Sequence, residues 1–450
     1  MRSSRAIAAI ALAAATATAA AACSGGSSSS SSSSSSSTPV TSTSASPSTS
    51  ATSAPVTLTW WNNATSGGLL TVWQNAIKSF EASHPGITIQ NVPIQNEQFT
   101  TKIPLALQSG SPPDIYQQWG GGQEETQLAS GKLTNLSTDV SSWISELGSA
   151  AQNWNVKGGW YGVPYDLHVV GFWYRKDLFA KAGISSPPTT IAQLESDDAK
   201  LKAAGITPIA VGSKDRWPDA FWWEYFAVRE CPTSVIQQAM SSVSLSNSCF
   251  SKATTDLTSF MATNPFQTGF LGTSSQQGAG SSAGMVGEGK AAMELQGDWD
   301  PGVMMGDIPA ADQKNLYNEL GWFPFPTIPG GQGNPKVVLG GGDGFSCTNG
   351  AAEPACAEFL QYLDTPAVQK EILGANVGLP ANPAANSDIT FPAEQTAAAA
   401  SSAAPYTAIY FDTAMPTQPG QNLDNAIANY FASPNSSTAA SILSAPSGPK

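Results

Sequence analysis

Short β-rich runs and longer helical patterns alternate along the chain from residue 56 onward. Residues 56–61 form a β-rich run that stops at paired asparagines and glycines, and residues 87–92 alternate as a half-buried strand. From residue 69, apolar residues recur every three or four positions, which predicts a helix between these strands. A second helix is predicted over 96–109, and residues 114–116 open a third strand. This order predicts an α/β layer with a largely parallel sheet.

Further helices and strands are predicted along the rest of the chain. The region from about 190 to 300 is predicted to be mostly helical, and the tail from residue 375 to carry sparse helices and a frayed last dozen residues. The other predicted elements are a hairpin at 159–166, strands at 167–174 and 336–339, a short strand within 289–299, and helices beginning near 175, over 352–363 and over 366–373.

The first 55 residues predict export and a tether. Arg2 and Arg5 precede an apolar run that ends at Cys23, which is typical of a signal peptide over 1–22. The four residues ending at Cys23 resemble a bacterial lipobox, although Ala20 stands where Leu is usual; a plain signal peptide is the alternative. The Ser/Thr/Pro-rich residues 23–55 predict a lipid-anchored, flexible linker. We therefore expect the protein at the extracellular face of a bacterial cytoplasmic membrane, held there only by its lipid.

Composition narrows the possible functions. The chain has 450 residues with 20 Lys+Arg against 33 Asp+Glu, a formal net charge of −13, so nucleic acid is not expected as a partner. Only 12% of residues are charged, yet there are 13 Trp. With only two His residues and no phosphate-binding or dinucleotide motif, we expect no metal site and no cofactor.

Four cysteines follow the proposed lipid-modified one. An even number in an exported chain predicts two disulfides. Sequence proximity favours Cys231 with Cys249 and Cys347 with Cys356, although three connectivities are possible. Zinc binding is the disfavoured alternative, because the spacings match no zinc finger.

Two patterns suggest catalysis. Residues 280–284 satisfy G-x-S-x-G, but both His residues precede Ser282, whereas the hydrolase order needs a His after the serine. The pair Asp298 and Asp300 is of the kind that a glycoside hydrolase uses. A secreted glycoside hydrolase therefore remains the alternative to a binding protein.

Four stretches together resemble the family 1 extracellular solute-binding proteins of ABC sugar importers, which are similar to the maltose-binding protein. The matching stretches, in the family's order, are residues 109–114, residues 162–165 with 174–179, residues 287–293 through 297–299, and residues 320–329 with 341–344. The resemblance is completed by residues 357–360 and 378–380.

The resemblance implies an α/β protein with the two-lobe periplasmic-binding-protein type II fold, hinge crossovers and a central ligand cleft. The crossovers are expected near 168–171, 338–341 and 375–378. The N-terminal lobe would comprise 56–170 plus 340–375, and the C-terminal lobe 171–339 plus 376–450. Closure of the lobes around a ligand would be a hinge movement.

A neutral sugar stacks its C–H faces on aromatic rings and exchanges hydrogen bonds with amides and carboxylates. Trp119 lies in a glycine-rich loop, and Trp299 matches the family's cleft tryptophan. Trp73, Trp143 and Trp173 lie on apolar faces and are expected in the core. The predicted ligand-binding residues are Asn63, Gln98, Gln118, Trp119, Asp166, His168, Trp223, Asp298, Trp299 and Asp343.

The function that this resemblance implies is capture of a neutral oligosaccharide, such as a xylo-, cello- or galacto-oligosaccharide, for the permease subunits of an ABC importer. We expect a monomer with no catalytic activity. A polyol or glycerophosphodiester is a further alternative, disfavoured because the proposed cleft loops contain no Arg.

Overall fold

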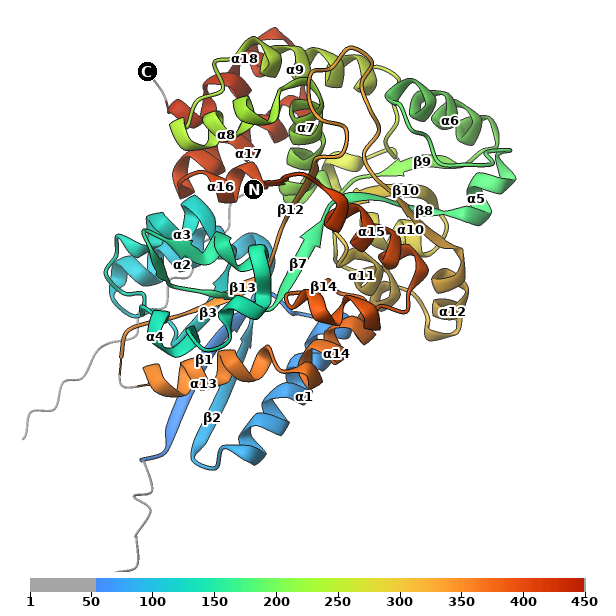
Figure 1. Ribbon diagram of the computed structural model, residues 1–450. Coiled ribbons are helices and arrows are strands. Elements are labelled where there is room, and N and C mark those ends of the chain that lie inside the picture. The colour runs from blue at the N-terminus through green and yellow to red at the C-terminus, as the bar shows by residue number, and fades with distance from the viewer. Residues whose placement is uncertain (1–53, 351, 449–450) are drawn as a thin grey trace, which may run out of the picture. The chain divides into compact units, whose positions relative to one another are not determined.

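The computed structural model describes residues 54–350 and 352–448. The predicted signal peptide, Cys23 and nearly all of the predicted linker lie outside the described residues. Figure 1 shows a mixed α/β architecture in which three sheets carry helices on their faces. No helix in the described ranges is long and apolar enough to cross a membrane.

The first sheet has the strand order β2-β1-β3-β13-β6. Strands β1, β2 and β3 run parallel, whereas β13 is antiparallel to β3 and β6. The strands are β1 (Val56–Asn62), β2 (Ile87–Pro93), β3 (Ile115–Gln118), β6 (Val163–Pro164) and β13 (Gly344–Cys347). The predicted parallel strands of the first third of the chain are therefore confirmed.

Helices cover both faces of this sheet. On α1 (Gly67–Ser83), Trp73, Ala76 and Phe80 recur at helical spacing and are buried against Phe359 of α13 and its neighbours. On the other face, α2 contributes Phe99 to a smaller core. The helices around this sheet are α2 (Asn96–Ser109), α3 (Gly121–Leu128), α4 (Ser137–Val140), α13 (Glu353–Leu363) and α14 (Pro366–Ala375), and a small hairpin pairs β4 (Asn155–Val156) with β5 (Gly159–Trp160).

The second sheet has the order β11-β8-β10-β9. Its helix α7 is buried on every side, which explains why its apolar residues show no single face. The strands are β8 (Gly171–Arg175), β9 (Thr207–Ala210), β10 (Ala291–Gln296) and β11 (Leu320–Phe323), and the helices are α5 (Lys176–Lys181), α6 (Ile191–Ala203), α7 (Trp217–Glu230), α8 (Thr233–Ser242), α9 (Ser248–Met261), α10 (Ser282–Gly287), α11 (Asp300–Asp307) and α12 (Ala310–Glu319).

A third sheet, which we call the crossing sheet, has the order β14-β7-β12-β15. Its strands are β7 (Asp166–Val169), β12 (Val338–Gly341), β14 (Leu379–Pro380) and β15 (Thr407–Ile409). Along the chain, β7 follows the first sheet and leads into β8 of the second, while β12 follows the second and leads into β13 of the first. The connections near 168–171 and 338–341 thus join the two larger sheets as expected; the exact lobe boundaries stay a prediction.

Three sequence predictions were wrong here. The hairpin predicted over 159–166 is instead two strands with different partners, because β5 pairs with β4 and β6 pairs with β13. The strand predicted over 167–174 is two strands, β7 and β8, which belong to different sheets. The tail is not sparsely helical or frayed: Leu423, Tyr430 and Ile442 are buried in the core of the second sheet. The tail helices are α15 (Pro392–Ala403), α16 (Phe411–Ala414), α17 (Thr417–Ala432) and α18 (Ser436–Ser444).

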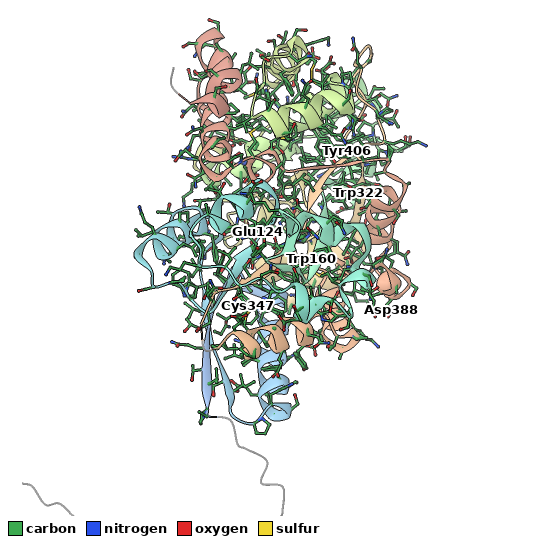
Figure 2. All side chains as sticks on the ribbon, turned by 60° about the vertical axis from the view of Figure 1, so that its left-hand side comes forward. Glu124, Trp160, Trp322, Cys347, Asp388 and Tyr406 are labelled. Carbon is green, nitrogen blue, oxygen red and sulfur yellow. A yellow bond between two sulfur atoms is a disulfide. The ribbon has the colours of Figure 1, made fainter. Side chains whose placement is uncertain are left out.

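Both predicted disulfides are present. Cys231–Cys249 joins the end of α7 to the start of α9. Cys347–Cys356 joins the end of β13 to α13, and Cys347 is labelled in Figure 2. Each bond closes a short loop within one part of the fold, so neither ties the two larger sheets to each other.

Candidate functional site

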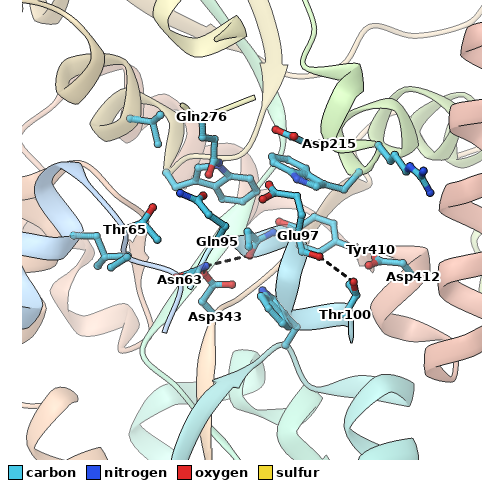
Figure 3. Close-up of a pocket in the computed structure, with 18 of the residues that line it drawn as sticks. Asn63, Thr65, Gln95, Glu97, Thr100, Asp215, Gln276, Asp343, Tyr410 and Asp412 are labelled. Carbon is cyan, nitrogen blue, oxygen red and sulfur yellow. Dashed lines mark hydrogen bonds between the residues drawn. The ribbon is translucent and has the colours of Figure 1, made fainter. Parts of the chain in front are cut away.

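A cavity of about 540 Å³ lies where loops from the two larger sheets and the crossing sheet meet. This volume is within the range typical of small-molecule sites. Figure 3 shows polar side chains from separate segments gathered around one space. The polar residues that line the cavity include Asn63, Thr65, Gln95, Asn96, Glu97, Thr100, Gln123, Asp215, Gln276, Asp343, Asp412, Gln421, Asp424 and Asn425.

Loops at the carboxyl ends of parallel strands supply one side of this cavity. Asn63 follows β1, residues 95–97 follow β2, and Trp119 follows β3. The carboxyl ends of parallel strands meet at one edge of a sheet, where ligands of such folds bind. Asn63 Nδ2 donates to Asn96 Oδ1 and to Asp343 Oδ2, each at 3.4 Å, while Asn63 Oδ1 is buried without a partner among the described residues.

Aromatic rings form another wall of the cavity. Trp217 and Trp299 have ring centroids 6.1 Å apart, and Phe221 lies 5.2 Å from Tyr410 and 6.3 Å from Trp299. The indole N–H groups of Trp217 and Trp299 and the hydroxyl of Tyr410 have no hydrogen-bond partner among the described residues. The wall therefore offers both apolar faces and unused hydrogen-bonding groups.

Trp119 is positioned by its own loop. Gln118 is fully buried, and its side-chain oxygen accepts from the backbone N–H of Trp119 at 2.8 Å and of Gly120 at 3.1 Å. The Asn153 amide donates to the Trp119 carbonyl at 2.8 Å. The Trp119 ring meets Phe99 edge-on, with centroids 5.8 Å apart. Gln118 therefore holds the loop and does not line the cavity.

Carboxyl groups give the cavity its charge. Burial raises the pKa of Asp215 to about 6, and the negative charge of Glu97 adds to the rise. The Ser275 N–H donates to Asp215 Oδ2 at 2.6 Å, and this hydrogen bond partly offsets the rise in pKa. Burial raises the pKa of Asp412 to about 6 as well. Both groups are mostly ionised at neutral pH and can accept hydrogen bonds from ligand hydroxyls.

His168 is the centre of a buried charged cluster beside the cavity. Its Nδ1 lies 2.9 Å from Asp298 Oδ1, and its Nε2 lies 3.2 Å from Asp166 Oδ1 and 3.7 Å from Asp343 Oδ2. Burial alone would lower the pKa of His168, but the negative charges of Asp166 and Asp298 raise it well above its usual value. The Trp299 ring packs edge-on against His168 at 4.6 Å.

This cluster ties the crossing sheet to the cavity. Asp298 also accepts from the backbone N–H groups of Val169 at 3.1 Å and Leu379 at 2.9 Å. Asp166 Oδ1 accepts from the Asp343 N–H at 2.9 Å. The carboxylates of Asp298 and Asp166 thus bind backbone N–H groups on or next to the strands β7, β14 and β12.

Asp166, His168 and Asp343 also bring possible metal ligands within 4.8 Å of one another. A protonated His168, however, neutralises part of the carboxylate charge without an ion. In addition, Asp343 Oδ2 accepts from the Tyr165 hydroxyl at 3.2 Å. The expectation that the protein uses no metal stays a prediction.

The structure places only four of the ten predicted ligand-binding residues at the cavity: Asn63, Trp119, Trp299 and Asp343. Gln98 is exposed on α2 and does not line the cavity, because the residues before it, 95–97, face inward. Trp223 is fully buried in the core, where its indole N–H donates to Thr254 at 2.8 Å. Neither residue lines the cavity in this structure, and their contact with a ligand stays a prediction.

The remaining four predicted residues lie behind the cavity wall. Gln118 supports the Trp119 loop, and Asp166, His168 and Asp298 are buried in the charged cluster. None of the four lines the cavity, so their direct contact with a ligand stays a prediction.

Sequence reasoning missed most of the aromatic wall and its acids. Trp217 is the first residue of α7, the helix that follows strand β9, and this position at the start of a helix was the available signal. Tyr410 and Asp412 come from the tail, for which only sparse helices were predicted. Arg216 also lines the cavity, which corrects the expectation that no Arg stands in the cleft loops.

Comparison with known proteins identifies the family to which this chain belongs. The family model described as "Bacterial extracellular solute-binding protein" matches residues 64–370. An uncharacterized ABC transporter extracellular-binding protein of Pyrococcus horikoshii is 25% identical, over 68% of this chain and 66% of its own length. The match thus spans just under two thirds of that relative.

Two further similarities point the same way. A probable sugar-binding periplasmic protein of Brucella suis is 26% identical over 69% of this chain and 71% of its own length. A structure solved in work on xylan utilization by the thermophilic bacterium Caldanaerobius polysaccharolyticus matches with a TM-score of 0.79 and 24% identity, over 86% of this chain and 99% of its own. The fold is therefore that of periplasmic solute-binding proteins. The chain belongs to the family of bacterial extracellular solute-binding proteins.

Proposed function

We propose that the protein is the substrate-binding subunit of an ABC importer and that it captures an oligosaccharide in the cavity. The observation that carries this proposal is the composition of the cavity lining, in which five aromatic residues stand beside amide and carboxyl groups: Trp119, Trp217, Phe221, Trp299 and Tyr410. Aromatic faces suit the C–H faces of sugar rings, and the polar groups suit their hydroxyls. The sugar-binding relative from Brucella suis supports the same ligand class.

The mechanism would be capture, lobe closure, docking on the permease subunits, and release. The connections through β7 and β12 provide the hinge for closure, since few backbone positions there would need to change. Diacylation of Cys23 would keep the protein at the outer face of the cytoplasmic membrane. No bond of the sugar would be made or broken.

A glycoside hydrolase is the second candidate, and the positions of Asp298 and Asp300, the carboxyl pair that suggested it, speak against it. Asp298 is bound to His168 and two backbone N–H groups, and Asp300 is fully buried at the start of α11. Neither residue lines the cavity. This arrangement supports a receptor.

The test is titration of the purified protein with xylo-, cello-, galacto- and chito-oligosaccharides, followed by calorimetry and tryptophan fluorescence, with chromatography of the sugars afterwards. We expect saturable binding, a fluorescence shift and unchanged sugar. Product formation would support the hydrolase instead, and failure of every sugar to bind the folded protein would refute the carbohydrate function.

The lipid anchor needs its own experiment. Cells that express the protein are labelled with radioactive palmitate, with Cys23→Ala as the control. Label in the parent protein and none in the variant is the expected result. Equal labelling of both, or of neither, would refute the anchor and leave a plain signal peptide.

A further inference from the structure

The cavity carries more acidic groups than its basic groups can neutralise. Six carboxyl groups line it, against two basic side chains, Lys214 and Arg216. Within the described residues, none of the six has a Lys or Arg nitrogen within 4.0 Å, and only Asp343 approaches a basic group, His168 at 3.7 Å. The six are Glu97, Asp215, Asp307, Asp343, Asp412 and Asp424.

The carboxyl groups are close enough to repel one another in pairs. Glu97, on α2 beside the first sheet, raises the pKa of Asp215, which precedes α7 beside the second sheet, by its negative charge in addition to the effect of burial. Figure 3 shows both side chains in the same part of the cavity. Burial raises the pKa of Asp424 well above its usual value, and Asp412 adds to that rise.

More acids stand behind the second pair. Asp219 and Glu224 of α7 are both fully buried, and their charges also raise the pKa of Asp424. Asp219 accepts from the Ser213 hydroxyl at 2.5 Å, and Glu224 accepts from the Phe411 N–H at 3.0 Å. Neither of these donors is charged. Each of these three carboxyl groups therefore holds its proton more tightly than usual, and a positive charge in the cavity would favour its ionised form.

The aromatic wall is suited to a positive charge. Tryptophan rings attract cations over their faces, more strongly where water is excluded, and both Trp217 and Trp299 line the cavity. Tyr410 is 8% exposed and lines the cavity, and its hydroxyl oxygen has no partner among the described residues. That oxygen is free to accept a hydrogen bond from an N–H group of a ligand.

We propose that the preferred ligand is a carbohydrate that carries a protonated amine, such as an oligomer of an amino sugar. This inference rests on the carbohydrate function proposed above and departs from the neutral ligand expected from the sequence. Lys214 lowers the pKa of Asp215 by its positive charge, but Lys214 and Arg216 are two basic groups against six carboxyl groups. An ammonium group donates hydrogen bonds to the carboxylates and adds positive charge to that of these two residues. Sugars that carry carboxylates or phosphates would be repelled.

The test compares two oligosaccharides of equal length that differ in one group: glucosamine oligomers and their neutral N-acetylated counterparts. Calorimetric titration near pH 7 should give at least about tenfold tighter binding of the amine, or ~1.4 kcal/mol. The preference should shrink when salt rises from about 0.05 M to about 0.5 M, because the Debye length falls several-fold.

Variants that each remove one carboxyl group test which of these groups produce the preference for the amine. Glu97→Gln and Asp215→Asn should each reduce the preference for the amine, whereas Glu358→Gln, which removes a charge from the exposed face of α13, should leave it unchanged. Equal or tighter binding of the neutral oligomer would overturn the amine inference and leave the carbohydrate function standing. If neither of these oligomers nor any other sugar of the panel binds the folded protein, the carbohydrate function itself fails.

Discussion

Trp299 occupies the cavity because Gly297 has no side chain. A Cβ atom at Gly297 would lie 2.0 Å from Cζ3 of the Trp299 ring, so the ring would have to move. We predict that Gly297→Ala weakens binding of the best oligosaccharide at least about tenfold, or ~1.4 kcal/mol, in calorimetric titration. Gly272→Ala is the matched control, because nothing lies within 4 Å of its added Cβ. Unchanged affinity of Gly297→Ala would show that this ring does not contact ligand.

The sequence distinguishes ligand-facing from buried tryptophans only where the local chain differs. Trp119 and Trp299 stand in loops with glycine and could be assigned to the cavity. Trp217 and Trp223 belong to a helix that is buried on all sides, so hydrophobic periodicity carries no information about which ring faces the ligand. Only its position in the first turn of α7, shortly after β9 in the chain, distinguishes Trp217 from Trp223.

Strand β7 is the element on which the charged cluster depends. His168 on β7 supplies the positive partner for Asp166 and Asp298, all of them buried. We predict that His168→Leu lowers the free energy of unfolding by about 3–5 kcal/mol, because it leaves buried carboxylates without their counter-charge. Urea denaturation of the variant and the parent protein measures this difference in the free energy of unfolding.

A histidine outside the cluster provides the control for that variant. His84 is partly exposed at the end of α1 and stacks on Phe80. His84→Leu should cost about 1 kcal/mol or less. Similar losses for both variants would mean that the cluster contributes nothing specific.

The tail helices show where element prediction from sequence stops. Regions with regular spacing, such as α1 and α2, were predicted to within two residues at their starts, and α2 was predicted at both ends. The tail is rich in Ala, Ser and Pro, so its few large apolar residues give a weak pattern. Those residues become informative only once the core that receives them is known, since tertiary packing stabilises most helices in proteins.

Helix α18 should therefore contribute measurably to stability. Ile442 is fully buried in the core of the second sheet, whereas its neighbour Ser441 is exposed. We predict that Ile442→Ala lowers the free energy of unfolding by about 2–4 kcal/mol, because it leaves a cavity. Ser441→Ala should change it by about 0.5 kcal/mol or less. A negligible effect of Ile442→Ala in urea denaturation would restore the expectation of a frayed end.

At the scale of the whole molecule, the family resemblance predicted what local patterns do not. The crossovers near 168–171 and 338–341 join residues far apart in the chain, and they match the places where β7 and β12 connect the sheets. The charge of the cavity was not predicted, because its acids come from five separate segments whose proximity depends on the complete fold.

Buried carboxyl groups throughout the molecule also set how its stability varies with pH. Burial raises the pKa of Asp198 and Asp219 to about 8 and that of Glu394 to about 9. In the unfolded chain such groups have pKa values of about 4, so the folded protein holds protons that the unfolded protein has released. The stability that these groups contribute is complete below about pH 4 and is lost as pH rises through about 8 to 9. The raised pKa of His168 acts in the same direction.

We therefore predict that the melting temperature falls from pH 6 to pH 9 by on the order of 5 °C, as measured by calorimetry. Asp198→Asn should make the fall smaller, because it removes one buried group that must ionise; both oxygens of Asp198 lack a hydrogen-bond partner among the described residues. Asp388→Asn, at an exposed position labelled in Figure 2, is the matched control and should leave the fall unchanged. A melting temperature that is constant or rises over this range would mean that these carboxyl groups are ionised in the folded protein at neutral pH.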